Sequence, residues 1–176
     1  LKVPAARELV LKLVAESDMV IENFRPGVMH RFGLGWEDLK QVNPKLVMLS
    51  ISGFGQEGPE KNRAAYANVL HAETGVIARQ ADCVKGPMGD IAFSMADTYS
   101  SLHGLVGALA ALHMANITGQ GQHVDIAMIN VMHGTDDFAN YLLDGDRGSR
   151  QHQDVWQAPE GKHLIIAADA KYLWHV

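Results

Sequence analysis

Residues 20–35 read VIENFRPGVMHRFGLG, an apolar strand that runs into a polar turn with proline and glycine and then into a short helix. In an open α/β sheet, such strand ends line the ligand crevice. Asn23 supplies an amide and Phe24 a flat apolar face. Arg25 and Arg31 add fixed positive charge, which suits a nucleotide-like ligand with a ring and phosphates. The same residues also fit a plain βα turn with two surface arginines.

Helices and strands alternate on both sides of this turn. Residues 5–17 carry the apolar stripe of an amphipathic helix and lead into a strand at 19–21. After the turn, residues 36–42 are predicted to form a short helix and residues 45–52 a buried apolar strand. The alternation predicts an α/β fold with a parallel sheet flanked by helices.

A glycine-rich loop at residues 53–59 follows the second strand, again at its carboxyl end. Because the carboxyl ends of parallel strands meet at one edge of a sheet, we expect this loop to face the same crevice as the first turn. Residues 64–73 are predicted to be helical. Residues 74–90 contain three glycines and a proline, and we expect them to be irregular, with room for one short strand.

The longest predicted helix covers residues 98–117. Its large apolar residues share one face, while small residues allow a neighbouring element to approach closely. The large residues are Leu102, Leu105, Val106, Leu109 and Leu112, and the small ones are Gly104, Gly107, Ala108 and Ala111.

A polar run at residues 144–149 follows a predicted strand at 122–126 and a predicted helix at 127–143, and it is the expected linker. We therefore assign residues 1–146 to a first domain. Residues 147–176 are then a linker and the beginning of a second, smaller domain.

The composition is typical of a soluble globular protein and excludes several classes of function. The 176 residues are 47% hydrophobic, and 15 Lys and Arg against 20 Asp and Glu give a formal net charge of −5. A mildly acidic chain without a long basic run argues against nucleic acid as a partner. Residues 102–114, the most apolar stretch, are too short to span a bilayer, so no membrane partner is expected. The nine histidines are not spaced as metal ligands, and no metal is expected.

Cys83 is the only cysteine, which leaves no internal disulfide and favours a reducing compartment, the cytoplasm.

The chain begins at Leu1 without an initiator methionine and stops just after an apolar strand. We therefore expect a piece of a longer polypeptide.

Asp97 stands immediately before the predicted 98–117 helix, where a carboxylate accepts hydrogen bonds from the first free backbone N–H groups. That N-cap role stabilises a helix by about 1 kcal/mol. The same place also suits a nucleophile, because the positive end of the helix keeps a carboxylate ionised and the N–H groups can stabilise an oxyanion. Both roles remain open on these residues alone.

Ordered motifs along almost the whole chain resemble those of the class III CoA-transferase family, which includes formyl-CoA transferase, carnitine CoA-transferase and the α-methylacyl-CoA racemases. Several motifs in family-like order are far more specific than any one of them. They are residues 21–27 (IENFRPG), 31–35 (RFGLG), 43–47 (NPKLV), 50–59 (SISGFGQEGP), 63–66 (RAAY), 96–98 (ADT), 107–112 (GALAAL) and 118–125 (TGQGQHVD).

This resemblance implies an enzyme that moves coenzyme A from an acyl-CoA thioester to a carboxylic acid, through an aspartyl-CoA thioester on Asp97. It implies a Rossmann-like parallel sheet flanked by helices as the central part of a large domain, followed by the start of a smaller α+β domain. It also implies an interlocked homodimer with acyl-CoA as substrate. Because the family's amino-terminal CoA-contacting strand and most of its small domain lie outside these 176 residues, it further implies that this piece is, by itself, impaired in CoA binding or turnover. The residues that match CoA-binding positions of the family are Asn23, Phe24, Val28, Arg31 and Tyr66, the last of them near the nucleophile.

Two departures from the family pattern bear on substrate choice. Ala67 stands where many relatives have an acidic residue, and Gln120 where they commonly have arginine.

An α-methylacyl-CoA racemase is the alternative enzyme, because that branch pairs the same aspartate with a histidine to exchange an α-proton. That histidine would align at Tyr66, and His71, about 140° further round a helix, is a poor substitute. The other alternative is a non-catalytic CoA-binding or dimerisation module in which Asp97 only caps its helix.

Overall fold

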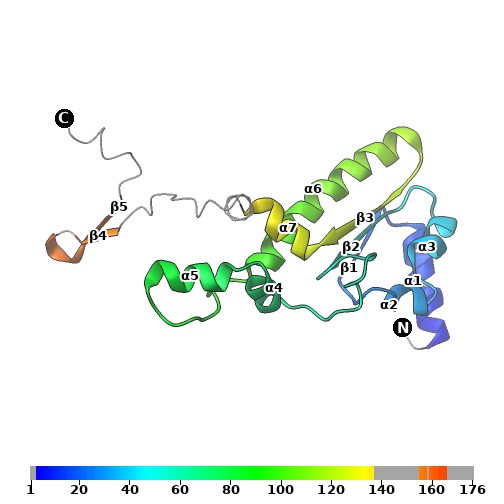
Figure 1. Cartoon of the computed structure of the whole chain (residues 1–176). Coiled ribbons are helices and arrows are strands. Elements are labelled where there is room, and N and C mark those ends of the chain that lie inside the picture. The colour runs from blue at the N-terminus through cyan, green and yellow to red at the C-terminus, as the bar shows by residue number, and fades with distance from the viewer. Residues whose placement is uncertain (1–2, 137–154, 158, 166–176) are drawn as a thin grey trace. The chain divides into compact units, whose positions relative to one another are not determined.

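The computed structural model describes residues 3–136, 155–157 and 159–165 (Figure 1). The chain divides into two units, residues 1–139 and 140–176. In the second unit, β4 (Val155–Gln157) and β5 (His163–Ile165) pair antiparallel on either side of η1 (Pro159–Gly161). The expected boundary between residues 146 and 147 lies outside the described residues.

The first unit contains α1 (Pro4–Ala15), β1 (Met19–Glu22), α2 (Val28–Arg31), α3 (Trp36–Val42), β2 (Val47–Ser52), α4 (Ala67–Glu73), α5 (Val76–Val84), α6 (Met95–Thr118), β3 (Gln122–Ala127) and α7 (Met128–Thr135).

The first unit is built on a three-stranded parallel sheet in the order β1-β2-β3. In the central strand β2, Val47 pairs with Met19 of β1 and with Gln122 of β3. Helices α1 and α3 pack on one face of the sheet and α6 on the other (Figure 1). The predicted α/β fold with a parallel sheet flanked by helices is confirmed, and the three strands end at the same edge.

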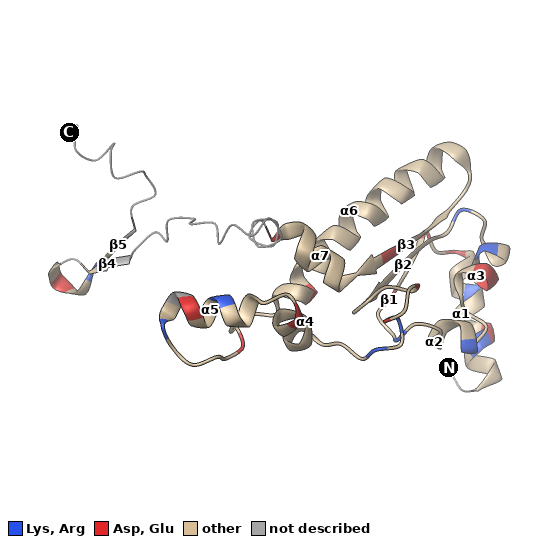
Figure 2. Ribbon diagram, viewed as in Figure 1, with Lys and Arg blue, Asp and Glu red and all other residues tan. Residues whose placement is uncertain are grey.

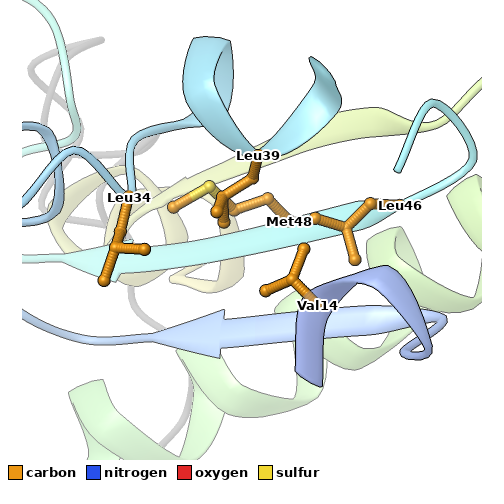
Figure 3. Packing of buried hydrophobic residues seen from close by; sticks show 5 residues of the cluster. All are labelled: Val14, Leu34, Leu39, Leu46 and Met48. Carbon is orange, nitrogen blue, oxygen red and sulfur yellow. The ribbon is translucent and has the colours of Figure 1, made fainter. Parts of the chain in front are cut away.

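Large apolar side chains fill the space between the sheet and the helices α1 and α3 (Figure 3). The buried cluster consists of Val14, Leu34, Leu39, Leu46 and Met48. Asn43, which follows α3, donates from Nδ2 to the carbonyl oxygens of Val14 at 3.2 Å and Ser17 at 2.8 Å. These bonds tie the end of α3 to the end of α1, so both helices hold a defined position on the sheet.

Small residues make the contact between α6 and the opposite face of the sheet. The buried residues of the helix recur every three or four positions and are Ala96, Ser100, Gly104, Ala108, Ala111 and Ala115. Gly104 marks a close approach, because a Cβ there would lie 3.2 Å from a methyl carbon of Leu49. The predicted close approach of a neighbour to this helix is confirmed, and the neighbour is the sheet.

The large apolar residues of α6 lie on the outer side of the helix. Leu105, Val106 and Leu109 are 52%, 69% and 54% exposed, and of the predicted stripe only Leu112 is partly buried against the sheet. After Asp97 the helix carries no Lys, Arg, Asp or Glu, and its ribbon is tan beyond the first turn in Figure 2. An apolar stripe normally faces the core of its own domain. Here, within the described residues, it is left uncovered.

Helix boundaries account for the main differences from the sequence-based expectations. α6 begins at Met95, three residues before the predicted start. α5 occupies the middle of the 74–90 segment that was expected to be irregular, because Gly75, with φ +76°, is the N-cap of this helix and does not interrupt it. α4 begins three residues later than predicted, because Tyr66 is extended (φ −128°, ψ 169°).

Candidate active site

A cavity of about 250 Å³ opens at the edge of the sheet where β1 and β2 end. Its walls come from the turn after β1, the end of β2, the segment before α4 and the first turns of α6 and α7. The lining residues are 23–26, 51–53, 63–66, Asp97, Ser101 and Met128. The cavity therefore brings together five residues that the sequence singled out, namely Asn23, Phe24, Arg25, Tyr66 and Asp97.

The turn after β1 is held by contacts of its own. The buried carboxylate of Glu22 accepts a hydrogen bond from the backbone N–H of Phe24 at 2.8 Å. The N–H of Val28 donates to the carbonyl oxygen of Arg25 at 3.1 Å. Gly27 has φ +79°, a conformation that residues with a Cβ rarely adopt. Together these features hold the turn in the conformation in which residues 23–26 line the cavity.

The other two residues expected to bind CoA, Val28 and Arg31, lie on α2 and do not line the cavity. Arg31 is exposed at the end of that helix. Arg25 does line the cavity, and its guanidinium has no hydrogen-bond or ion-pair partner among the described residues. Of the two arginines in the turn motif, only Arg25 thus lines the cavity.

Gly53 brings the segment before α4 against the end of β2. A Cβ on Gly53 would collide with the Cβ of Ala65, so only glycine allows this crossing. Tyr66, the residue before α4, lines the cavity and is 76% exposed. Its side chain is therefore accessible to a ligand that enters the cavity.

Arg63 contributes a second guanidinium to the wall, but this one is paired. It forms an ion pair with Glu73, lies 3.6 Å from a carboxylate oxygen of Glu60 and stacks over the ring of Phe54, 5.0 Å from its centroid. The hydrogen bond with Glu73, together with the negative charges of both carboxylates, raises the pKa of Arg63. Carboxylates of Glu60 and Glu73 thus balance the charge of Arg63, whereas Arg25 has no such partner among the described residues.

Asp97 is the third residue of α6, and Ser94 is the N-cap. The predicted start of this helix at residue 98 is therefore wrong, and of the two roles left open for Asp97 the N-cap role is not the one observed: the N–H of Thr98 bonds to the carbonyl oxygen of Ser94 at 3.0 Å. The Asp97 carboxylate makes no hydrogen bond to any residue in the described ranges, is exposed and lines the cavity. A carboxylate in the first turn is stabilised by the positive end of the helix. Asp97 is thus accessible and not used in capping.

Ser52, the last residue of β2, was not singled out by the sequence. It lines the cavity and is 7% exposed, and its hydroxyl has no hydrogen-bond partner in the described part of the chain. Leaving a buried hydroxyl unpaired is unfavourable by about 1–3 kcal/mol. The signal that could have identified Ser52 is its place at the carboxyl end of a buried strand, and the same rule applies to Met128 after β3.

The described residues contain neither a cluster of metal-ligating side chains nor a helix that could span a membrane. No group of three or more His, Cys, Asp and Glu side chains is placed there to hold a metal ion. Among the helices of the same residues, none has both the length and the apolar character needed to cross a bilayer.

Comparison with known proteins identifies relatives of this chain. The model of CoA-transferase family III matches residues 1–175. The beta subunit of succinyl-CoA–L-malate CoA-transferase from Chloroflexus aurantiacus is 40% identical over 126 residues, which are 71% of this chain and 31% of that protein. Succinyl-CoA:mesaconate CoA-transferase from Haloarcula hispanica is 34% identical over 184 residues, covering 96% and 46% of the two chains. The crystal structure of a CAIB/BAIF family protein from Brucella suis is similar with a TM-score of 0.74 at 35% identity, covering 90% of this chain and 42% of that one. This chain thus spans less than half the length of these relatives.

Proposed function

The chain belongs to CoA-transferase family III, and from this premise we propose that it carries the reaction centre of an enzyme that transfers coenzyme A from an acyl-CoA thioester to a carboxylic acid. The observation that carries the proposal is the Asp97 carboxylate, which lines the cavity at the positive end of α6 and is not engaged by the described residues. The names of the two relatives above pair succinyl-CoA with malate or mesaconate, which supports this class of reaction.

Asp97 would act as a covalent nucleophile in this proposal. A carboxylate oxygen attacks the thioester carbonyl carbon, the C–S bond breaks, and a mixed anhydride and CoA thiolate form. The thiolate then attacks the aspartyl carbonyl, which releases the donor acid as a carboxylate and leaves an aspartyl-CoA thioester. The acceptor carboxylate attacks that thioester, and the returning thiolate takes the acceptor acyl group and regenerates Asp97. The net reaction neither consumes nor releases a proton.

The size of the cavity limits which part of the substrate it can hold. At about 250 Å³ it is smaller than the range of about 300–1,000 Å³ that is usual for sites of drug-sized ligands. We therefore assign the cavity to the thioester end of acyl-CoA and place the nucleotide end outside it. This division keeps Val28 and Arg31 as proposed CoA contacts, because both lie on α2 beyond the cavity.

The side chains around Asp97 suit the thioester end of the substrate. Phe24 and Tyr66 offer apolar faces to the pantetheine arm. Arg25 offers a charge that can hold a carboxylate of the acceptor or a phosphate of CoA. Asn23 and Ser52 offer an amide and a hydroxyl that can donate to substrate oxygens.

Trapping the covalent intermediate tests the role of Asp97. The intact protein is incubated with acyl-CoAs and quenched with hydroxylamine, and peptide mass spectrometry is used to look for a hydroxamate on Asp97. Asp97→Asn should fold normally and lower transfer on the order of 10³-fold or more, because an amide is a far weaker nucleophile. Asp82→Asn, the same change at an exposed position on α5, is the control. Unchanged transfer by the Asp97→Asn variant would exclude Asp97 as the nucleophile.

Paired arginine variants test the two binding regions. Arg25→Ala should weaken acceptor or CoA binding about 10-fold or more, through loss of a charge-assisted contact. Arg31→Ala should weaken binding of CoA but not of an acceptor acid that lacks a nucleotide. Isothermal titration with CoA and with dicarboxylic acids separates the two effects. Equal affinity of both variants and the wild type for every ligand would remove both arginines from the site.

The racemase alternative receives no support from the position of His71. A racemase needs a second base opposite the aspartate, but His71 does not line the cavity. Its Nε2 lies 3.2 Å from the backbone nitrogen of Ala96 and accepts that N–H. Tyr66 occupies the place where the racemase branch has its histidine, so proton exchange at an α-carbon has no second base in the described part of the cavity.

We further propose that the enzyme works in the cytoplasm as an interlocked homodimer. The outer face of α6 supports the dimer, because Leu102, Leu105, Val106 and Leu109 are each more than half exposed and no charged residue separates them. The single cysteine supports a reducing compartment. Light scattering of the intact protein tests the dimer.

A further inference from the structure

His71 is almost completely buried, and both of its ring nitrogens are engaged. The residue lies on α4 and is 1% exposed. Its Nδ1 is 2.8 Å from Oδ1 of Asp90, and its Nε2 is 3.2 Å from the backbone nitrogen of Ala96. Ala96 is the second residue of α6 and directly precedes Asp97. The imidazole therefore connects α4, the segment before α6 and the first turn of α6.

The partners of His71 determine where its proton is. A backbone N–H can only donate, so Nε2 must be the acceptor and carries no hydrogen. The proton is then on Nδ1 and is donated to Asp90, whose Oδ1 also accepts the N–H of Ile91 at 2.9 Å. Asp90 thus selects one tautomer of a neutral imidazole, the one that can accept the N–H of Ala96.

The bond from Ala96 satisfies one of the backbone N–H groups that every helix start leaves without an intrahelical partner. Ala96 is fully buried, so this N–H has no access to water and would otherwise be unpaired. Because the bond is made one residue before Asp97, it restrains the backbone from which the Asp97 carboxylate projects.

From this arrangement we propose that His71 and Asp90 are positioning residues: they hold the first turn of α6 so that the Asp97 carboxylate is presented to the cavity at a fixed place. Neither residue lines the cavity, so neither touches the reacting atoms. The inference rests on the proposed role of Asp97 as nucleophile. Positioning of this kind contributes strongly to rate, since a displacement of about 1 Å can lower it on the order of 10²-fold.

The tautomer is tested directly by NMR. Two-bond ¹⁵N–¹H correlation spectra of the ¹⁵N-labelled intact protein, assigned with a His71→Gln variant, should show His71 neutral and protonated on Nδ1. In Asp90→Ala the proton should move to Nε2 in a measurable fraction of molecules. A wild-type His71 protonated on Nε2 would overturn the inference, whatever the activity of the enzyme.

Kinetic variants test the consequence for Asp97. Asp90 is 41% exposed, so Asp90→Ala should fold, keep the affinity for CoA and slow hydroxamate formation on Asp97 about 10-fold. His71→Leu, which removes both ring nitrogens, should slow it further, and His71→Gln, which keeps an acceptor oxygen within reach of Ala96, should restore part of the rate. His103→Leu is the matched control, because the His103 ring also bonds a backbone group, the Tyr99 carbonyl at 2.8 Å, but lies outside the cavity.

The outcomes separate this inference from the proposed function. If wild-type Asp97 is labelled and Asp90→Ala is labelled at the same rate, the positioning role is wrong and the nucleophile stands. If wild-type Asp97 is never labelled although CoA binds, the proposed function fails first. If His71→Leu does not fold, Asp90→Ala and His71→Gln still decide the question. A slow Asp90→Ala variant with unchanged affinity for CoA supports the inference.

Discussion

The two faces of the parallel sheet are covered in opposite ways. Against α1 and α3, large side chains such as Leu39 and Met48 point inward and interlock, and both helices carry charged residues elsewhere on their surface (Figures 2 and 3). Against α6, the residues that meet the sheet are small, and large apolar ones such as Val106 and Leu109 point away from it. On the first face, α1 and α3 complete a hydrophobic core with the sheet. On the second face, small residues allow α6 to lie close to the sheet, and its large apolar residues form an exposed surface.

This contrast explains how one helix can contribute both to the cavity and to an exposed apolar surface. Small residues let the helix approach the sheet, and its first turn then reaches the edge where β1 and β2 end. Asp97 is at that end, and the apolar outer residues lie further along. Exchanging large and small side chains on the two faces of the sheet tests this contrast.

Truncation in the α1/α3 core should have the largest effect. Leu39→Ala removes a fully buried side chain and should lower the unfolding free energy of the intact protein by about 2–5 kcal/mol, through lost burial and the cavity left behind. Val42→Ala, on the same helix but 39% exposed, is the matched control and should have a clearly smaller effect. Urea denaturation followed by circular dichroism measures both. Equal losses would mean that this face is not packed as described.

Enlargement on the inner side of α6 should come next. Ala108→Leu adds volume where the helix meets the sheet and should destabilise the protein by about 1–3 kcal/mol through overpacking. Ala110→Leu, the same change at an exposed position of the helix, should alter stability by less than about 0.5 kcal/mol. If Ala108→Leu is tolerated as well as Ala110→Leu, small size is not what places α6 on the sheet.

Charge on the outer side of α6 should scarcely change the stability of the folded unit. Val106→Lys and Leu109→Lys replace exposed residues, so the effect within a single chain should stay within about 0.5 kcal/mol. In the intact protein the same variants should shift the proposed dimer towards monomer, which light scattering measures across a range of concentrations. A dimer that withstands the double variant would show that another surface makes the interface.

Removal of a buried hydroxyl should have the smallest effect. The Ser100 hydroxyl is buried and has no hydrogen-bond partner in the described residues, so Ser100→Ala should be neutral or slightly stabilising. Ser100→Val, which adds volume at the same place, should destabilise. Calorimetric melting of the two variants compares them. A loss of stability in Ser100→Ala would indicate a partner that the described residues do not supply.

Local patterns predicted most of the fold. The strand endings after Ile21 and Ser52 were visible as apolar runs followed by glycine-containing turns, and the parallel sheet followed from alternation with helices. The segment at 74–90 was missed because glycine was interpreted as an interruption, although Gly75 only bounds α5. The start of α6 was placed too late, since Asp at position 97 resembles an N-cap whether or not the helix has already begun.

The candidate site was predicted in outline. Asn23, Phe24, Tyr66 and Asp97 do line one cavity, although they lie far apart in the sequence. Arg31 was preferred to Arg25 on resemblance to the family, and only the path of the turn shows that Arg25 is the one in the cavity wall. Ser52 was not predicted, because no local sequence feature distinguishes a buried hydroxyl that has a hydrogen-bond partner from one that lacks it. The Ser50 hydroxyl, for example, bonds to His123, whereas the Ser52 hydroxyl has no partner among the described residues.

By itself, the sequence determined most of the order of helices and strands, with α5 as the exception, together with the parallel sheet, the family and the nucleophile candidate, because periodicity, turn residues and motifs are properties of neighbouring positions. The tertiary structure alone decided which side of α6 is buried, where Asp97 stands in its helix and that His71 meets Asp90 and Ala96. Those features depend on contacts between segments that are distant along the chain, and the packing of the whole unit selects among local alternatives of similar energy.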